Sequence, residues 1–440
     1  MRPRTVRIGV TGLARSGKTV LLTAIAACLL APGALGGRVR SARVAPAGAA
    51  SIPRFDYARH LAALAADPPH WPGRTDTVSM LSLDLELGHD ALPARPVRLE
   101  LLDYPGEWLL DLPLLGQDFA AWSRDTVRRL QSPRAEPAAR EFLRFATALP
   151  DRAGADEALA ASGHALFHAT LERLRDERRL SLLQPGRFLM PPPGPVPPWM
   201  GFFPLPGRSP LAELMAGRYG AYQSATREAL VSPAFGRVDR LLVLADLLGA
   251  LHAGPDSFAD AAEALGAAAG ALRPTGDWLA AFQALARLEL PPRPIRRVAF
   301  VASKADHVSE RQRGNLAALV GSLTGAPDGR GGFARAAARP GGAASFAVAS
   351  VRCTEDIVWT LDGHPVSAVR GRVLGEDRFT RSYPGEVPDR APGPEFWAHP
   401  FLALPDFEPA RLPDAGMGRR SAPPQLGLDA LLGFLLEDVL

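Results

Sequence analysis

The residues best suited to chemistry form a glycine-rich loop near the N-terminus. Val6 to Val10 has an alternating, β-rich pattern, and a stretch of helical character runs on to about Leu30. Between them, residues 12–19 have the GxxxxGK[ST] pattern, in the required order of strand, loop and helix. Such a loop directs backbone N–H groups toward phosphate oxygens, and the positive end of the helix adds to that field. The sequence therefore predicts a loop that binds a nucleoside triphosphate.

Three side chains of this loop have predicted roles beyond simple contact. Lys18 would reach the β- and γ-phosphates, and the Thr19 hydroxyl would be a ligand of Mg²⁺. Arg15 is a candidate for stabilising charge that develops during hydrolysis, because the loop resembles that of guanylate-binding proteins, which has the form GLxRxGKS with an arginine acting in cis. The residues expected to contact the nucleotide here are Gly12, Ala14, Arg15, Ser16, Gly17, Lys18, Thr19 and Val20.

A second motif follows a predicted strand that ends near Leu102. Asp103-Tyr104-Pro105-Gly106 has the DxxG pattern of P-loop NTPases, in which the carboxylate lies close to Mg²⁺ and a backbone N–H lies near the γ-phosphate. Asp103 is thus a predicted metal ligand and Gly106 a predicted nucleotide contact. Glu107 occupies the position where many GTPases have a water-orienting glutamine, so it has two competing interpretations, a catalytic one and a structural one.

The segment between these motifs is where a GTPase has its first switch region. A threonine of that region meets Mg²⁺ when the γ-phosphate is bound. Thr75 and Thr77 are both candidates, and the sequence does not choose between them. Arg74 is a second candidate for a catalytic arginine, because its spacing from Thr77 resembles the switch arginine of heterotrimeric G-protein α subunits.

The predicted base site follows two later strands. An apolar strand from Arg297 to Ala302 leads into Ser303-Lys304-Ala305-Asp306, which resembles the guanine motif [NT]KxD. The lysine stem would lie along the base, and the Asp306 carboxylate would accept from guanine N1–H and the 2-amino group, worth about 1–3 kcal/mol over adenine. Ser303 departs from the motif, so an ATPase remains the alternative. Ser350 and Val351, after a last strand, are expected to contact the base.

The composition agrees with a nucleotide-binding enzyme and excludes several other classes. Lysine and arginine number 50, yet Lys18 and Lys304 are the only lysines, and both lie in nucleotide motifs. The arginines are scattered, so nothing predicts nucleic-acid binding. No apolar run is long enough for a transmembrane helix, and the two cysteines are expected to be reduced in a cytosolic protein.

The order of elements predicts the fold class. We expect an α/β P-loop NTPase domain of the GTPase type with a mostly parallel sheet, formed by residues 1–136 and 236–360. Residues 137–235 are expected to be a helical insertion, with a helix from Ala165 to Leu183 and a Pro/Gly-rich loop after it. Residues 361–440 are expected to be a C-terminal extension, with a hairpin or strand pair from Val366 to Phe379 and a closing amphipathic helix from Leu428 to Leu436.

Four segments together resemble the YcjX-like family. They are residues 9–19 around the loop, Ile52-Pro53-Arg54-Phe55-Asp56-Tyr57, residues 103–114, and Lys304-Ala305-Asp306-His307-Val308, and the resemblance spans nearly the whole chain. The resemblance implies a bacterial cytosolic P-loop NTPase, usually thought of as a GTPase, that is tied to envelope-stress responses.

The function predicted is Mg²⁺-dependent binding and slow hydrolysis of GTP, with GTP and GDP as bound nucleotides and Lys18, Arg15 and Glu107 as catalytic residues. A protein partner is expected to bind through the helical insertion, with peripheral association with the envelope-stress machinery. The alternatives are an ATPase of the same fold and a nucleotide-gated scaffold whose hydrolysis is incidental.

Overall fold

The computed structural model describes residues 3–46, 52–73, 78–88, 93–191, 194–231, 238–272, 295–329, 342–398, 404–412 and 422–440. The chain forms two compact units. The first contains residues 1–104, 237–255 and 293–440, and the second contains residues 105–236 and 256–292. The second unit begins directly after the predicted metal ligand Asp103 and its neighbour Tyr104.

The first unit is built on a seven-stranded sheet with the order β2-β3-β4-β1-β5-β6-β7. Strands β4, β1, β5, β6 and β7 are mutually parallel, and β3 and β2 extend the sheet with antiparallel pairing. The strands are β1 (Arg4–Gly12), β2 (Val39–Val44), β3 (Ser79–Leu87), β4 (Arg95–Asp103), β5 (Arg240–Ala245), β6 (Arg297–Ala302) and β7 (Gly342–Ala347). This arrangement confirms the predicted α/β fold with a mostly parallel sheet.

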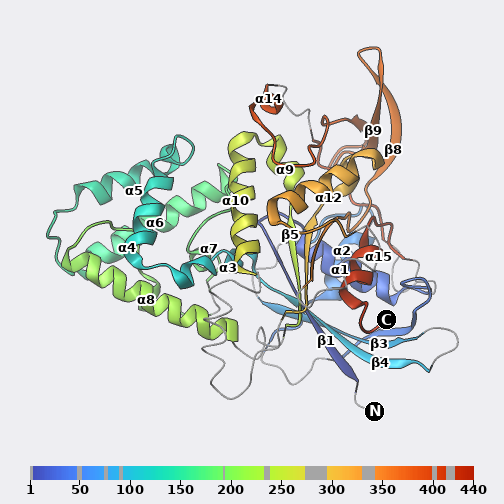
Figure 1. The fold of residues 1–440 in the computed structure, drawn as a ribbon, viewed down its shortest axis with the longest axis horizontal. Coiled ribbons are helices and arrows are strands. Elements are labelled where there is room, and N and C mark those ends of the chain that lie inside the picture. The colour runs from blue at the N-terminus through green and yellow to red at the C-terminus, as the bar shows by residue number, and fades with distance from the viewer. Residues whose placement is uncertain are drawn as a thin grey trace. The chain divides into compact units, whose positions relative to one another are not determined.

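The strand sequences account for this layering. All six residues of β5 are buried, as expected for a central parallel strand covered on both faces. Helices α1 (Lys18–Leu30) and α15 (Leu428–Leu436) share one apolar core with β1, β3 and β4. Figure 1 shows the parallel strands running away from the N-terminus, so that their carboxyl ends lie together at one end of the unit.

The remaining helices of the first unit are short, apart from one that packs against β6 and β7. They are α2 (Tyr57–Ala65), α9 (Leu247–His252), the 3₁₀ turn η3 (Ala305–His307), α12 (Glu310–Thr324) and α14 (Pro394–Trp397). The second unit is helical, with α3 (Gly106–Leu109), η1 (Pro113–Gly116), α4 (Phe119–Leu130), α5 (Glu136–Ala148), α6 (Glu157–Asp176), α7 (Gly186–Leu189), η2 (Pro198–Met200), α8 (Pro210–Val231) and α10 (Pro255–Ala271).

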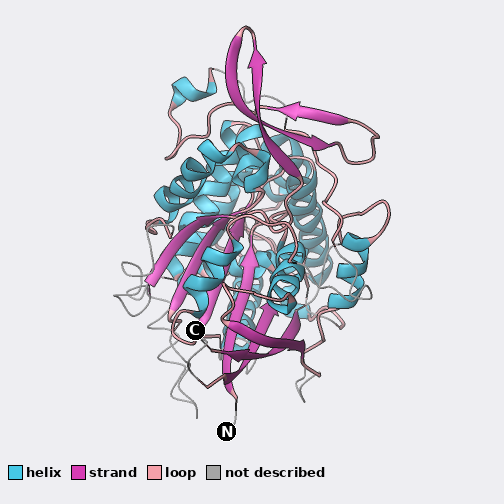
Figure 2. Ribbon diagram, turned by 90° about the vertical axis from the view of Figure 1, so that its right-hand side faces the viewer, coloured by secondary structure: helices cyan, strands magenta, loops and turns pink. Residues whose placement is uncertain are grey.

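A three-stranded antiparallel sheet carries the hairpin of the C-terminal region. It contains β8 (Thr354–Leu361), β9 (His364–Arg372) and β10 (Phe379–Ser382) in the order β10-β9-β8. The predicted strand pair is β9 with β10, but the sequence analysis missed β8. The signal was the dipeptide Asp362-Gly363, whose φ values of 48° and 81° suit a tight hairpin turn. Figures 1 and 2 show that the β8–β9 hairpin projects beyond the carboxyl ends of the parallel strands.

Two predicted helices have different outcomes. The closing helix lies where expected, and Arg240 fixes its end: the fully buried guanidinium donates to Leu435 O and pairs with Asp438 at 2.5 Å. The helix predicted from Ala165 begins earlier instead, at Glu157, because the Asp156 side chain caps it. It ends at Asp176, and the chain turns at Arg179 with φ 54°.

Aromatic packing forms the core of the second unit. Trp122 is stacked on Tyr219 with ring centroids 5.1 Å apart, and Phe202 meets Trp122 edge-on at 5.4 Å. Such pairs stabilise by about 0.5–1.5 kcal/mol beyond the area that they bury. The helical unit therefore has a core of its own.

Candidate nucleotide site

The backbone of the loop between β1 and α1 has the shape that phosphate binding needs. Leu13 N donates to Leu244 O at 2.8 Å, which holds the loop against β5. A Cβ on Gly12 would lie 2.8 Å from Leu244 N, so only glycine allows this close approach. Arg15 and Gly17 have left-handed φ values of 63° and 84°, which curl the loop before the helix begins. Curled backbone of this kind turns successive N–H groups into one concavity.

The side chains of the loop fit an anionic ligand. Lys18 Nζ donates to Gly12 O at 3.3 Å, so its ammonium group lies across the loop. Ser16 is 1% exposed, and its hydroxyl has no hydrogen-bond partner among the described residues, although an unsatisfied buried hydroxyl costs about 1–3 kcal/mol. The N-cap residue of α1 is Gly17, which has no side chain to cap the helix, and the first turn has no acidic residue. A phosphate at this helix end would satisfy both the backbone donors and the dipole.

Asp103 lies beside this loop, as the DxxG motif predicts. It is the last residue of β4 and stands next to Val10 in the parallel pairing with β1. Tyr104 N donates to Val10 O at 2.9 Å, which continues the pairing past the strand end. Asp103 is 3% exposed. Carboxylate and hydroxyl oxygens suit Mg²⁺, which takes few protein ligands when phosphate oxygens complete its shell, so Asp103 and Thr19 fit this ion.

The other predicted residues around the phosphates have mixed outcomes. Gly106 and Glu107 lie in α3, the first helix of the second unit, and their role in the site stays a prediction. Arg74, Thr75 and Thr77 lie outside the described residues.

The predicted base-contacting residues stand at the same edge of the sheet as the phosphate loop. Lys304 follows β6 with a left-handed φ of 59°, and Asp306 lies in η3 directly after it. Asp306 is 2% exposed, and its Oδ2 accepts from Cys353 N at 2.7 Å. Because β1, β4, β5 and β6 are parallel, their carboxyl ends bring these motifs to one edge, where ligands of open α/β sheets bind.

The loop after β7 closes the same region. Ala305 N donates to Val348 O at 3.1 Å, which joins the turn after β6 to the end of β7. Val351 is buried and Ser350 partly buried, and the backbone of this loop leads to Cys353, the partner of Asp306. Ser350 and Val351 therefore stand beside the Asp306 motif, and their contact with a base stays a prediction.

Sequence reasoning missed two residues of this region. Asp246 follows the buried strand β5, and its carboxylate lies 2.6 Å from Lys304 Nζ. Cys353 is the second of these residues, because its backbone N–H donates to Asp306. The position of Asp246 could have been recognised, because polar residues at the carboxyl ends of parallel strands are expected at such a site.

The chain that follows the DxxG motif is fixed within the helical unit by a buried carboxylate. Asp111 is fully buried and accepts from Gly186 N at 2.7 Å, Arg187 N at 3.3 Å and the Tyr222 hydroxyl. Burial raises the pKa of Asp111 to about 6, against the lowering effect of the bonds from Tyr222 and Gly186. Helices α7 and α8 therefore meet the segment between α3 and η1 at one side chain.

Further contacts hold the same segment along its length. Trp108 Nε1 donates to Met190 O at 2.9 Å, and the buried Arg187 guanidinium lies 4.4 Å from the centre of the Trp108 ring. From α8, Arg227 Nη2 donates to Leu115 O at 2.6 Å and Gln223 Nε2 to Gln117 O at 2.9 Å. A movement of this segment would therefore disturb its hydrogen bonds to the α7 region and to α8.

Replacing Tyr222 by Phe tests the charge on Asp111. Tyr222→Phe is expected to lower the free energy of unfolding by about 1–3 kcal/mol at pH 8, where Asp111 is ionised and loses a donor. Because the lost bond favours the ionised form, the effect should shrink below the pKa near 6, where Asp111 binds a proton. Urea unfolding followed by tryptophan fluorescence at pH 8 and pH 5 measures both values.

Tyr219→Phe is the matched control, because the Tyr219 hydroxyl donates to the carbonyls of Leu114 and Gln117, and a carbonyl does not titrate. We expect a loss that does not depend on pH over this range. An equal loss for Tyr222→Phe at both pH values would contradict an ionised Asp111.

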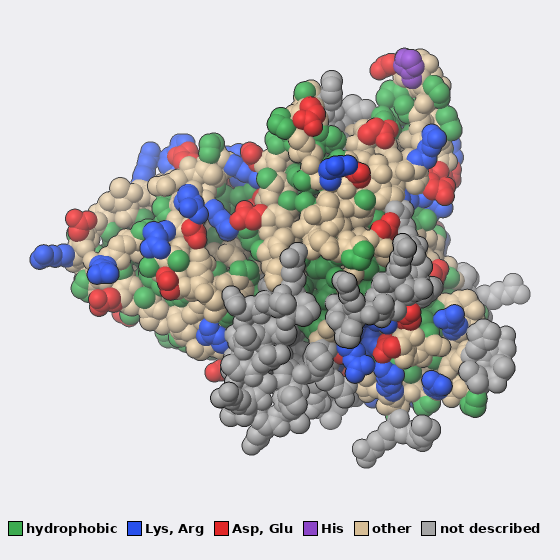
Figure 3. Space-filling model, in the orientation of Figure 1, with side chains coloured by type: hydrophobic (Ala, Val, Ile, Leu, Met, Phe, Trp, Pro, Cys, Tyr) green, Lys and Arg blue, Asp and Glu red, His purple; other side chains and the backbone are tan. Residues whose placement is uncertain are grey.

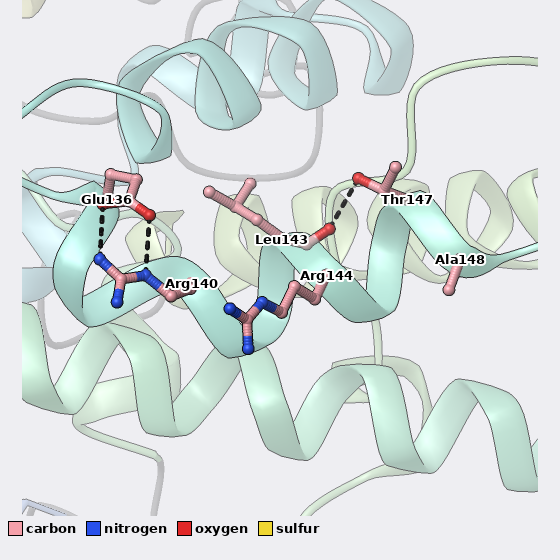
Figure 4. Close-up of a pocket in the computed structure, with 6 residues that line it drawn as sticks. All are labelled: Glu136, Arg140, Leu143, Arg144, Thr147 and Ala148. Carbon is pink, nitrogen blue, oxygen red and sulfur yellow. Dashed lines mark hydrogen bonds and ion pairs between the residues drawn. The ribbon is translucent and has the colours of Figure 1, made fainter.

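A hollow of about 470 Å³ on the surface of the helical unit is not comparable to the nucleotide site. All six residues that line it, shown in Figure 4, belong to α5. Glu136 pairs with Arg140 at 3.0 Å and Thr147 donates to Leu143 O, so these groups satisfy one another along the helix. In Figure 3, acidic and basic side chains are interspersed over the described surface of this face.

Among the described residues, no helix has the length and apolar character of a membrane-spanning segment. Nor do three or more His, Cys, Asp or Glu side chains gather in those parts of the chain as a metal cluster would require.

The sheet order and the loop between β1 and α1 define the class as an α/β protein with a P-loop NTPase fold of the GTPase type. The chain belongs to the YcjX-like family, whose model matches residues 6–440. It is 33% identical to the Ras-like GTPase YcjX of Escherichia coli (strain K12), with 99% of this chain and 96% of that protein aligned. It is 28% identical to the Ras-like GTPase YcjX of Shewanella oneidensis (strain MR-1), over 99% and 95% of the two chains.

Proposed function

We propose that this protein is a Mg²⁺-dependent GTPase that cycles between GTP- and GDP-bound states. The observation that carries the proposal lies at one edge of one sheet, where a loop shaped for phosphate stands with a motif suited to guanine that contains the half-buried Lys304 and the buried Asp306. The relatives named Ras-like GTPases support the same activity. The setting, a cytosolic switch in envelope-stress responses, rests on the family resemblance alone.

The chain's own groups account for binding and for charge stabilisation. Lys18 and the α1 end would neutralise phosphate charge, and Thr19 and Asp103 would hold Mg²⁺, which would supply further positive charge to the bound nucleotide. Hydrolysis of GTP needs little covalent chemistry from the protein, because a positioned water is the nucleophile. Glu107 follows Gly106 directly, and we assign it the task of orienting that water.

A switch also needs a part that responds to it. The segment after Asp103 is bonded to α7 and α8 through Asp111, Trp108 and Arg227. Contact of Gly106 with the γ-phosphate would therefore bias the conformation of the helical unit. We assign the surface of this unit to a protein partner.

Nucleotide binding and phosphate release by the purified full-length protein test this function. Fluorescent GTP analogues are expected to bind at least about tenfold more tightly than ATP analogues, with slow multiple turnover in Mg²⁺. Equal binding of both would favour an ATPase or an unselective enzyme. Tight GTP binding without turnover would favour a nucleotide-gated scaffold.

Arg15→Ala tests the source of the catalytic positive charge. Arg15 is exposed in the curled loop and has no ion pair among the described residues, so its side chain is available to a ligand. We expect kcat for GTP to fall at least about tenfold with little change in Kd, because a contact made only in the transition state spares ground-state binding. Single-turnover hydrolysis with a separate Kd measurement gives both values.

Arg74→Ala is the comparison for that experiment. A normal rate in Arg15→Ala with a slowed rate in Arg74→Ala would transfer the role to Arg74. Normal rates in both variants would mean that any such arginine comes from a partner.

A further inference from the structure

Asp246 occupies the turn directly after the central strand β5, and both of its carboxylate oxygens are engaged. Oδ1 accepts from Gly249 N at 2.8 Å, which caps α9. Oδ2 lies 2.6 Å from Lys304 Nζ, and the Asp246 side chain is 12% exposed. The bond from Gly249 N therefore orients the carboxylate so that Oδ2 faces the Lys304 ammonium group.

Gly249 keeps this arrangement open. A Cβ at this position would lie 2.8 Å from Asp246 Oδ2, the oxygen that faces Lys304. Real Cβ atoms essentially never come this close, so a side chain here would displace the carboxylate. The absence of a side chain at Gly249 thus leaves room for Asp246 Oδ2 to contact Lys304.

Both the backbone next to Lys304 and its side-chain ammonium group are bonded to the end of β5. Its backbone follows Ser303, whose N and Oγ donate to Ala245 O at 3.0 and 3.3 Å. Its ammonium group pairs with Asp246, the residue after Ala245. Burial by itself would lower the pKa of Lys304, but the carboxylates of Asp246, Asp406 and Asp306 reverse this and raise it. The side chain therefore stays charged while its aliphatic stem is held in one direction.

We propose that Asp246 is a positioning residue for nucleotide selection, which fixes the Lys304 stem in the orientation that supports the guanine base. This inference rests on the proposed function and extends it to a residue outside the nucleotide motifs. Asp246 acts through Lys304 and does not itself contact the phosphates. Its loss should therefore weaken the base side of the site and leave the phosphate side intact.

Asp246→Asn separates the two sides of the site. Asparagine can still cap α9 with its oxygen, but it turns an uncharged N–H₂ group toward the Lys304 ammonium. We expect Kd for GTP and GDP to rise about tenfold, while kcat at saturating GTP stays within about twofold of the wild type. Inorganic triphosphate, which has no base, should compete for the site with the wild-type inhibition constant. Asp246→Ser, which also retains a cap, should behave in the same way.

Asp239 provides the matched control. It precedes the same strand, is buried, and pairs with Arg240 at 2.8 Å. Asp239→Asn thus removes a buried carboxylate–cation pair from the opposite end of β5, and it is expected to lower the thermal midpoint without changing Kd for GTP.

Several outcomes would overturn the inference. Wild-type GTP affinity in Asp246→Asn and Asp246→Ser would do so, as would an equal loss of affinity for GTP and inorganic triphosphate. A rise in Kd for Asp239→Asn as large as that for Asp246→Asn would show a general effect of stability. In each of these cases the wild type still binds GTP, and the proposed function stands; a wild type that binds no GTP would overturn both.

Discussion

An Asp306→Asn variant is expected to prefer xanthine nucleotides, whereas the wild type is expected to prefer guanine nucleotides. In the structure Asp306 is buried and its Oδ2 accepts from Cys353 N at 2.7 Å. With Oδ2 held by this bond, we expect the carboxylate to accept from guanine N1–H and the 2-amino group. The orientation of the carboxylate is therefore set before the base arrives.

The bond from Cys353 also decides how asparagine would lie. Its amide oxygen must face Cys353 N, because an N–H₂ group there would oppose another donor. The amide nitrogen then faces the base, where it opposes the 2-amino group of guanine and donates to the 2-carbonyl oxygen of xanthine. A buried donor left without an acceptor costs about 1–3 kcal/mol, or roughly a factor of 5 to 150 in affinity.

Competition by GTP, XTP and ATP against a fluorescent diphosphate measures this exchange. We expect GTP to lose at least about tenfold in affinity and XTP to gain by a similar factor. Thermal unfolding serves as the control for the loss of a buried charge. If GTP still binds the variant as it binds the wild type, Asp306 does not contact the base.

Lys18→Ala is expected to abolish most triphosphate binding while the fold survives. The Lys18 ammonium lies across the phosphate loop, 3.3 Å from Gly12 O, and is the point charge best placed for the β- and γ-phosphates. We expect a loss of at least about 2 kcal/mol, or roughly 30-fold in Kd for GTP. Alanine is a strong helix former, so α1 should still begin at this position.

Calorimetry with GTP and GDP, together with circular dichroism, measures both parts of this prediction. Lys18→Arg is the informative partner variant, because it retains the charge but replaces a compact ammonium by a planar fork. We expect Lys18→Arg to lose affinity as well. Unchanged GTP affinity in a folded Lys18→Ala protein would remove the phosphate-loop assignment.

Local patterns were sufficient to predict the motifs of the site. The phosphate loop needs glycines and a lysine at set spacings between a strand and a helix, and all of these are adjacent in the chain. Asp103 and Lys304 were recognisable for the same reason, since one ends a strand and the other lies two residues after one. The closing helix was equally local, because its run of leucines has helical spacing from Leu428 to Leu436.

Element boundaries were less predictable where a single side chain or turn decides them. The cap by Asp156 starts α6 eight residues before the expected position at Ala165. The turn at Asp362-Gly363 adds strand β8, which the apolar pattern alone did not indicate. Caps and turns depend on a few dihedral angles, and their sequence signals are short.

The sequence by itself determined the chemistry that we propose for this protein, because the residues expected to bind phosphate, metal and base are grouped in short motifs. Only the tertiary structure decided how those groups are held. Asp246 and Lys304 are far apart in the chain and meet because β5 and β6 are parallel neighbours. Asp306 is oriented by a backbone N–H from the loop after β7, and Asp111 by donors from α7 and α8. Such pairs arise from strand order and burial, which create a need for partners that no local spacing reveals.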